Sequence, residues 1–455
     1  MDFVHRTFQD CLGARYAVEE GHLDVLLKNA DDTQWEDVVR MAVAHARSHE
    51  RAWLLEQLLK RRTPRLTLLA LACLEHVAAL DAGVRAEVEA RAAALIPPRT
   101  KDDARALAEA GPLVLELLPG PEGLTDAEAL GVTITASLLG EAEPEGALGV
   151  LRRFRGHTDF DVREQLVAAW GKFDAEVYAS EVLNHVDQTR LRLFCESPEQ
   201  RAALARIRPW RWLSFQGAHR IEDIWAALPW PEAVTSIALR DNPDLTDLGA
   251  LLPFRELQQL WVDDCPAPAG LDRLSVLPLT LLGWSGGGDL TGLRSLRKLT
   301  TLSVSQRLPG TDLAQALPVE APLSFLFLGR FSTDATGFRG LRHWPGLHTL
   351  SLGPLTTAPT AADWREVAEL PGLAHLYVNG SIVREFPHSL DLMPVLPGIA
   401  MLRVPMMLGT EDLSTLASRL PGLRSVILGS RNGHSLPASR YKELFPNARL
   451  TVEEN

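Results

Sequence analysis

Few residues in this sequence have the types and spacing that catalysis or metal binding requires. His45 and His49 lie four residues apart, the spacing at which two imidazoles on one helix face bind zinc. Ala46 stands where a zinc peptidase carries its general base, and no third ligand lies at a fixed distance. A solvated helix face explains the pair better than a zinc site. No Ser or Cys was recognised in a triad context, so we expect no catalytic centre.

The glycine-containing segments also do not match a phosphate-binding loop. A P-loop needs GxxxxGK followed by Ser or Thr, whereas Gly171 and Lys172 are followed by Phe173, with no Gly five residues earlier. The glycine run at 286–288 follows an apolar segment but lacks the Lys and hydroxyl that would hold phosphate and magnesium. We therefore predict that this polypeptide does not hydrolyse ATP and holds no cofactor of its own.

The residues best suited to chemistry are those of a binding surface. Large side chains recur beside the middle leucine of short LxxLxL segments, whose leucines already account for a core. Aromatic, Met and Arg side chains on an exposed surface have the composition of a protein-binding hot spot. The alternative is that they pack on one another or under a neighbouring domain. The candidates are Trp261, Phe325, Phe327, His375, Tyr377, Met401 and Arg403.

The LxxLxL template that positions these candidates repeats throughout the second half of the chain. Start-to-start intervals run from 20 to 26 residues, within the range of leucine-rich repeats. A weaker unit, WRWLSF, begins at Trp210, and the tail RLTVEEN is a candidate last strand. The template occurs as VTSIAL, LQQLWV, LTLLGW, LTTLSV, LSFLFL, LHTLSL, LAHLYV, IAMLRV and LRSVIL, starting at residues 234, 257, 279, 299, 323, 347, 373, 399 and 423.

This pattern predicts a leucine-rich-repeat horseshoe over residues 207–455, with a parallel β-sheet on its concave face. The template leucines turn into the core and the residues between them face the concave side. Because neighbouring strands lie about 4.8 Å apart, Phe327, Ser351, Tyr377 and Arg403 should form one column. The return segments contain apolar residues at helical spacing, and Pro-Gly pairs stop them before the next strand.

Residues 23–206 carry helix periodicity and few strand signals, which predicts an α-helical domain. The segment DVREQLVAAW, from Asp161 to Trp170, resembles the second helix of a HEAT-type repeat, in which the acidic residue caps the helix and the Arg reaches a neighbour. An ordinary capped amphipathic helix has the same pattern. The chain as a whole is predicted to be an α/β repeat protein, with a HEAT-like helical domain before the horseshoe.

The first twenty residues carry the most specific short motif. The string FVHRTFQDCLGARYAVEE resembles the end of the winged-helix segment in NACHT-type ATPases, the NLR-like branch of signal-transducing NTPases. Cys11 stands where an aromatic is usual, and Gly13 where Ala is usual. We interpret residues 1–22 as a remnant of that segment. The resemblance implies that His5 contacts the phosphates of bound ADP, whereas a surface or core histidine is the alternative.

The resemblance implies a function as well. Helices followed by leucine-rich repeats are similar in order to the C-terminal half of that family, which would make this chain the non-catalytic sensor half of a bacterial defence or signalling protein. ADP or ATP would then be relevant only if an NTPase domain is joined to it. A free-standing helical and leucine-rich-repeat scaffold for protein–protein interaction is the alternative.

The charge composition of the chain limits the classes of partner that it is expected to bind. Asp and Glu total 58 against 46 Lys and Arg, a formal net charge of −12, and no long basic run appears, which argues against nucleic acid and anionic lipid. A protein ligand is expected, with an NTPase domain or self-association as further partners. No apolar stretch approaches a membrane span, and no secretion signal precedes the motif. Four scattered cysteines without CxxC spacing then indicate free thiols in the cytoplasm.

Overall fold

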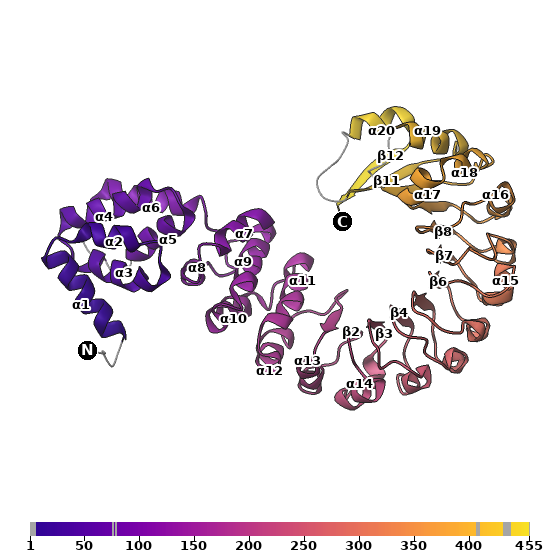
Figure 1. Ribbon diagram of the computed structural model, residues 1–455, viewed down its shortest axis with the longest axis horizontal. Helices are drawn as coiled ribbons and strands as arrows, with labels where there is room; N and C mark the ends of the chain where they lie inside the picture. The colour runs from indigo at the N-terminus through magenta and orange to yellow at the C-terminus, as the bar shows by residue number, and fades with distance from the viewer. Residues whose placement is uncertain (1–5, 75–76, 78–79, 406–409, 431–437, 455) are drawn as a thin grey trace. The chain divides into compact units, whose positions relative to one another are not determined.

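The computed structural model describes residues 6–74, 77, 80–405, 410–430 and 438–454 (Figure 1). Contacts between residues divide the chain into two compact units. Unit 1 runs to Leu191 and includes Arg206–Arg208, and unit 2 comprises Arg192–Ala205 and the chain from Pro209 onward. The domain limits predicted from the sequence stay predictions.

Unit 1 is built from short helices, several of which begin at a side-chain cap. At the start of α9, the Thr125 hydroxyl accepts from the Glu128 N–H, and the Glu128 carboxylate accepts from the Thr125 N–H at 3.0 Å. The hydrogen bonds that the Thr125 N–H and hydroxyl donate to its carboxylate lower the pKa of Glu128. The helices are α1 (Arg6–Glu19), α2 (Leu23–Asn29), α3 (Glu36–His45), α4 (Ser48–Lys60), α5 (Pro64–Cys73), α6 (Ala82–Ala93), α7 (Lys101–Ala108), α8 (Leu113–Leu117), α9 (Asp126–Leu139), α10 (Pro144–Leu151), α11 (Phe160–Ala168) and α12 (Ala175–Tyr178).

The first helix presents an unexpected face. Its apolar residues at helical spacing would ordinarily form the buried stripe, yet Leu12 and Tyr16 are 41% and 60% exposed. The helix instead packs against α3, with the small side chains of Ala14 and Ala17 buried. Small residues allow close approach of two helices, so α1 packs through its small side chains and turns its larger apolar ones outward.

In α11, a buried arginine ties its helix to the following segment. The Arg163 side chain is buried, and its Nη1 donates to the carbonyls of Asp187 and Thr189 at 2.6 and 3.2 Å. The helix cap is Asp159, which accepts from the Val162 N–H, rather than Asp161. The Arg therefore reaches a neighbour as expected, while the HEAT-type interpretation stays a prediction.

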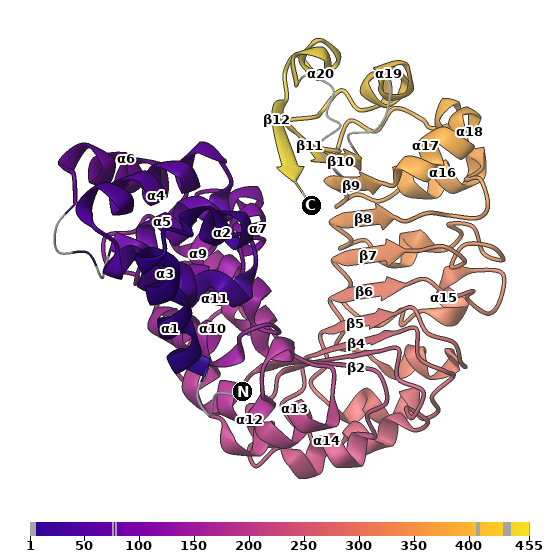
Figure 2. The same cartoon turned by 60° about the vertical axis from the view of Figure 1, so that its left-hand side comes forward.

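Unit 2 is a leucine-rich-repeat fold with one continuous parallel sheet. Its twelve strands are hydrogen-bonded in chain order, so each repeat adds one strand beside the last (Figure 2). All nine template segments form strands, as do WRWLSF and the tail. The strands are β1 (Leu193–Cys195), β2 (Trp212–Gln216), β3 (Ser236–Arg240), β4 (Gln259–Asp263), β5 (Leu281–Trp284), β6 (Thr301–Val304), β7 (Phe325–Leu328), β8 (Thr349–Leu352), β9 (His375–Val378), β10 (Met401–Pro405), β11 (Ser425–Ser430) and β12 (Arg449–Glu454).

The alternation of side chains across the strands is the one expected. In β7 to β9, Leu326, Leu350 and Leu376 are fully buried in the core, whereas Phe325 and Phe327 are half-buried on the opposite face. Strand β1 was not anticipated, because LFC lacks the template and falls in a stretch assigned to helix. It pairs with β2 and begins the sheet before the first expected repeat.

The return segments change character along unit 2. Those between β3 and β6 are short 3₁₀ turns, whereas most later returns contain α-helices. The 3₁₀ returns are η8 (Leu248–Leu251), η9 (Leu271–Val276) and η10 (Thr291–Ser295), followed later by η11 (Leu341–His343). The helical returns are α13 (Pro198–Ala203) and α14 (Ile221–Ala227), then α15 (Leu313–Ala316), α16 (Ala361–Ala368), α17 (Gly380–Glu385), α18 (Pro387–Asp391), α19 (Thr410–Arg419) and α20 (Ala438–Leu444).

Two polar residues close the turns of the early repeats. The fully buried Asn242 accepts from the N–H groups of His219 and Asp244, and its amide donates to the His219 carbonyl at 2.6 Å. The buried Cys265 thiol lies 3.6 Å from the Leu239 carbonyl of the preceding repeat. Both residues therefore satisfy backbone groups that the turn would otherwise leave unpaired.

Candidate functional site

The strand register places most of the candidate binding residues in two neighbouring rows on the inner face of the sheet. Phe327, Ser351, Tyr377 and Arg403 are successive Cα partners across β7 to β10. The parallel row contains Phe325, Thr349, His375 and Met401. Within these two rows, Thr349 and Ser351 are buried and the other six side chains are half-buried. We call these eight residues the aromatic rows; whether they bind a partner stays a prediction.

Within the aromatic rows, the rings lean over the middle strand. The strands β7 and β9 are two spacings apart, about 9.6 Å. The ring centroids of Phe325 and Tyr377 are nevertheless only 6.5 Å apart, at an angle of 66°. This approach covers β8, which explains why the small side chains of Thr349 and Ser351 are only 7% and 8% exposed. Edge-to-face packing of this kind holds the rings in place.

A cation and a thioether border Tyr377. The guanidinium carbon of Arg403 lies 5.9 Å from the Tyr377 ring centroid, within the range of a cation–π interaction. The Tyr377 hydroxyl lies 3.9 Å from the Met401 sulfur. One polarisable, one aromatic and one cationic side chain therefore meet on two adjacent strands.

Two histidines complete this part of the face. The rings of His348 and His375 meet edge to face with centroids 4.3 Å apart, and the Thr349 hydroxyl lies 3.3 Å from His375 Nδ1. Burial, with a further contribution from His348, lowers the pKa of His375. The imidazole of His375 is thus favoured in its neutral form, in which it can donate and accept hydrogen bonds.

Trp261 lies away from the other candidates. Its Cα partner on β5 is Gly283, the partner of Gly283 on β6 is Ser303, and the partner of Ser303 on β7 is Phe327. Two strands therefore separate Trp261 from the first residue of the aromatic rows in its row. The indole ring occupies the space that a Cβ on Gly283 would fill. Trp261 therefore lies flat on the next strand, and the structure does not bring it together with the aromatic rows.

The other sequence motifs assemble no reactive site among the described residues. His5, the proposed nucleotide contact, lies outside them. His45 ends α3 and His49 lies in α4, so the two do not share one helix. No group of three His, Cys, Asp or Glu in the described part of the chain could hold a metal ion.

One serine motif was missed in the sequence analysis. Residues 283–287 read GWSGG, which matches the GxSxG pattern of a nucleophile elbow. The motif lies at the end of β5, not on a strand-to-helix turn, and the Ser285 hydroxyl donates to the Asp263 carboxylate at 3.0 Å. Asp263 in turn pairs with Arg240 at 3.4 Å. The Ser285 hydroxyl is therefore hydrogen-bonded to a carboxylate and not to an imidazole base.

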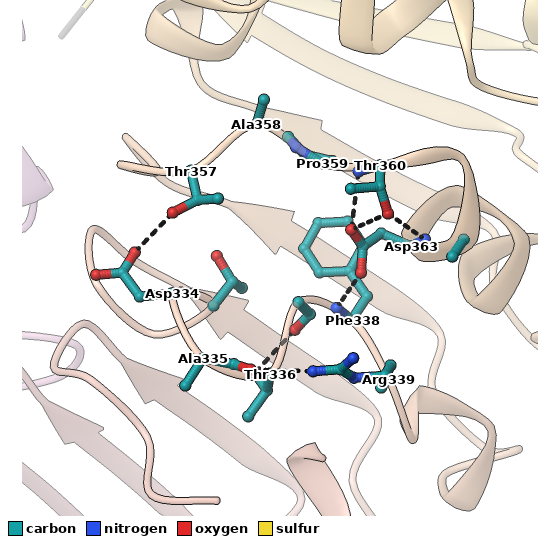
Figure 3. A pocket seen from close by; sticks show the side chains of 13 residues that line it. Asp334, Ala335, Thr336, Phe338, Arg339, Thr357, Ala358, Pro359, Thr360 and Asp363 are labelled. Atoms are coloured by element: carbon teal, nitrogen blue, oxygen red, sulfur yellow. Dashed lines mark hydrogen bonds between the residues drawn. The ribbon is translucent and has the colours of Figure 1, made fainter. Parts of the chain in front are cut away.

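A polar pocket of about 220 Å³ lies between the segments that follow β7 and β8 (Figure 3). The carboxylates of this pocket accept hydrogen bonds from neighbouring residues of the turns. Asp363 accepts from the Phe338 N–H at 2.6 Å and from the Thr360 hydroxyl at 2.6 Å, and Asp334 accepts from the Thr357 hydroxyl at 3.1 Å. These bonds, drawn in Figure 3, use the acceptors that a ligand would need, so the pocket is explained by turn structure.

Three residues near the aromatic rows were missed from the sequence. His348 and Arg424 each follow the first residue of a template segment, a position that was not considered. Arg449 pairs with Ser425 at the start of β12, where the template is degraded. Reading all three intervening positions of LxxLxL, rather than the two flanking the middle leucine, would have found His348 and Arg424.

Comparison with solved structures finds leucine-rich-repeat proteins. Internalin C2 from Listeria monocytogenes is 16% identical over 49% of this chain and 82% of its own, with a TM-score of 0.26. A leucine-rich-repeat protein from Leptospira interrogans is 12% identical over 66% of this chain and 94% of its own, with a TM-score of 0.22. No protein-family model and no curated protein matches the chain. Among the described residues, none of the helices has the length and apolar character that a membrane crossing requires.

Proposed function

We propose that this chain is a non-catalytic protein-interaction module whose partner binds the aromatic rows. The observation that carries the proposal is the half-exposed group of Phe325, Phe327 and Tyr377 on the open face of the sheet. The leucines of the same strands already form the core, so these rings are not needed to fill it. Large aromatic side chains beside an arginine are the composition of interface hot spots.

Capture of the partner by variants tests this role. Phe327→Ala, Tyr377→Ala and Arg403→Ala combined should reduce recovery of bound protein at least about tenfold, because hot-spot residues carry most of the binding energy. The matched control is Trp225→Ala, since Trp225 is an exposed aromatic on α14, 47% accessible. Unchanged recovery with the triple variant would contradict the proposal.

A photo-cross-linking residue gives a second readout. Placed at position 327, it should cross-link to the partner in host cells, whereas the same residue at position 225 should not. Cross-linking at 225 alone would place the partner on the return-helix side of the repeats and remove the inner face from the interaction.

We further propose that the module is the sensor half of an NLR-like defence or signalling protein acting in the cytoplasm. The motif from Phe3 to Glu20 supports this, as does the order of helices and repeats. The outward face of α1 adds physical support, because Leu12 and Tyr16 form an apolar stripe that a joined or separate NTPase domain would cover. Occupancy of the repeats would have to favour one arrangement over another to reach such a domain.

The DNA upstream of the Met1 codon separates this role from a free-standing scaffold. An in-frame P-loop followed by an acidic Walker B strand would support the sensor. A promoter and ribosome-binding site immediately before Met1 would favour the scaffold. Phosphate contact by His5 is part of the sensor proposal only, and is tested by nucleotide binding of the joined protein with His5→Ala.

A further inference from the structure

The two inner rows of β7 to β12, taken with the residue before each strand, carry a charge opposite in sign to that of the whole chain. The chain carries a formal net charge of −12. The two aromatic rows continue through Ser425 and Arg449 and through Ile427 and Thr451. Together with the residue before each strand, these positions contain three arginines and two histidines but no Asp or Glu. The arginines are Arg403, Arg424 and Arg449, which carry the positive charge, and the histidines are His348 and His375.

The two outer arginines are accessible. Arg424 and Arg449 have exposed side chains, and no ion pair formed by the described residues involves either of them. Glu453 and Glu454 come later in β12, in register with Gly429 and Ser430 and beyond the rows considered. By contrast, Arg240 on the early part of the sheet pairs with Asp263. The charge of Arg240 is thus paired within the sheet, whereas the side chains of Arg424 and Arg449 are exposed at its late end.

Apolar and cationic groups alternate over short distances on this face. Arg403 lies against the Tyr377 ring, and that ring contacts Phe325. Thr349 and Ser351 form a floor between the rings, because both are buried although they are small and belong to the open face. A ligand that places a carboxylate beside an apolar side chain would satisfy the arginine and the rings together.

We propose that the partner surface recognised by the aromatic rows is an acidic peptide segment with an aromatic or aliphatic anchor. The anchor contacts Phe325 and Tyr377, and its neighbouring carboxylates pair with Arg403, Arg424 and Arg449. The proposal rests on the protein-binding role given above. Nucleic acid is the less favoured ligand, because the face has no lysine and the strongly negative chain repels a polyanion over long range.

A random dodecapeptide library displayed on phage, selected against the immobilised full chain, tests the proposal. Selected peptides should be enriched in Asp and Glu beside Phe, Tyr, Trp or Leu. A fluorescein-labelled consensus peptide and its Asn/Gln counterpart then serve as anisotropy probes. The acidic probe should bind at least about tenfold more tightly than the neutral one, with a difference that shrinks as salt rises.

Charge variants assign the site. The combination Arg403→Glu, Arg424→Glu and Arg449→Glu should weaken the acidic probe at least about tenfold and the neutral probe much less. Replacement of the same residues by Gln gives an intermediate loss without introducing repulsion. The control reverses three exposed arginines away from the rows, Arg255, Arg294 and Arg342, and should leave the dissociation constant within about twofold.

The outcomes separate this inference from the proposed function. One contrary result is that the selected peptides require Phe327 and Tyr377 for binding without being enriched in Asp and Glu. Another is that they bind the Arg→Glu variants as well as the wild type. Either result would overturn the acidic partner and leave the interaction module intact. Failure to select any peptide on the aromatic rows would overturn the peptide partner, and the capture of the partner by the triple variant then decides the proposed function separately. Binding of labelled oligouridylate that the same reversals abolish, with no acidic peptide selected, would replace the peptide by a single-stranded nucleic acid.

Discussion

The strands β2 to β5 and β7 to β10 share one backbone geometry but use their inner side chains differently. On the early strands, the buried Ser236 hydroxyl of β3 accepts from Arg192, which precedes β1, at 3.1 Å, and Trp261 lies on Gly283. On the late strands, rings of Phe325 and Tyr377 cover β8 and stay half exposed. Inner positions therefore serve either as internal cover or as an accessible surface, and the neighbouring side chains decide which.

The largest expected difference concerns the turns. Asn242→Ala should lower the free energy of unfolding by about 3 kcal/mol, because it leaves the buried N–H and carbonyl of His219 without partners and also removes the acceptor of the Asp244 N–H. Asn379 caps α17 through one local bond to the Ser381 N–H. Asn379→Ala should cost about 1 kcal/mol. Urea unfolding followed by circular dichroism measures both, and equal losses would erase the contrast between early and late turns.

A second comparison uses two glycines. A methyl group on Gly283 would overlap the Trp261 ring, so Gly283→Ala should destabilise the fold by about 1–3 kcal/mol. Gly429 in β11 has no neighbour within 4 Å of the position its Cβ would take. Gly429→Ala should change stability by less than about 1 kcal/mol. Thermal unfolding of the two variants checks this, and a harmless Gly283→Ala would mean that Trp261 is not needed as cover.

The pH dependence of stability should come partly from the early strands. His219 is buried, and its Nδ1 accepts from Arg201 at 2.8 Å. Burial, reinforced by Arg201, lowers the pKa of His219. The unfolded chain then binds the proton more readily, so this stability is present above about pH 6.5 and is lost as pH falls toward the folded-state pKa. Urea midpoints across this range should fall less steeply for His219→Gln than for the wild type; an identical slope would assign the dependence elsewhere.

The smallest expected effect concerns the reactivity of the cysteine thiols in the two regions. Cys195 and Cys265 of the early repeats are buried, as is Cys73 in unit 1, whereas Cys11 is half-buried. Burial raises the pKa of Cys73 to about 12 and also raises the pKa of Cys195 and Cys265. Ellman's reagent should therefore modify Cys11 first in the native protein and all four thiols in urea. Rapid native labelling of a variant with both Cys11→Ser and Cys73→Ser would show that the early repeats open readily.

Much of the repeat fold could be predicted from the sequence because each strand buries the same leucine positions. The template located β3 to β11, and the register then followed from one residue per row. Strand β1 was missed because Leu193 and Cys195 are its only buried residues and carry no template. Three residues are too few for periodicity to separate a strand from a helix.

The face of a helix and the use of a surface were harder to predict. The sequence of α1 does not show which side packs, since Ala14 and Ala17 are buried in place of the larger residues. For the candidate site, the strand alternation placed Phe327, Tyr377 and Arg403 correctly in one row. It could not reveal that His348 contacts His375, because that contact depends on side-chain direction at the residue before β8.

The change in return segments has a mechanical consequence. A strand occupies about 4.8 Å of the sheet, whereas an α-helix with side chains is about 10–12 Å wide and a 3₁₀ turn is narrower. Repeats with helical returns, such as α16 and α19, are therefore wedges with their thick edge outward. Stacked wedges bend the ribbon more tightly than the flatter early repeats do. Adding or removing one helical turn in these return segments would change the radius of curvature of the repeats. The curvature in turn limits the diameter of a partner that fits against the inner face.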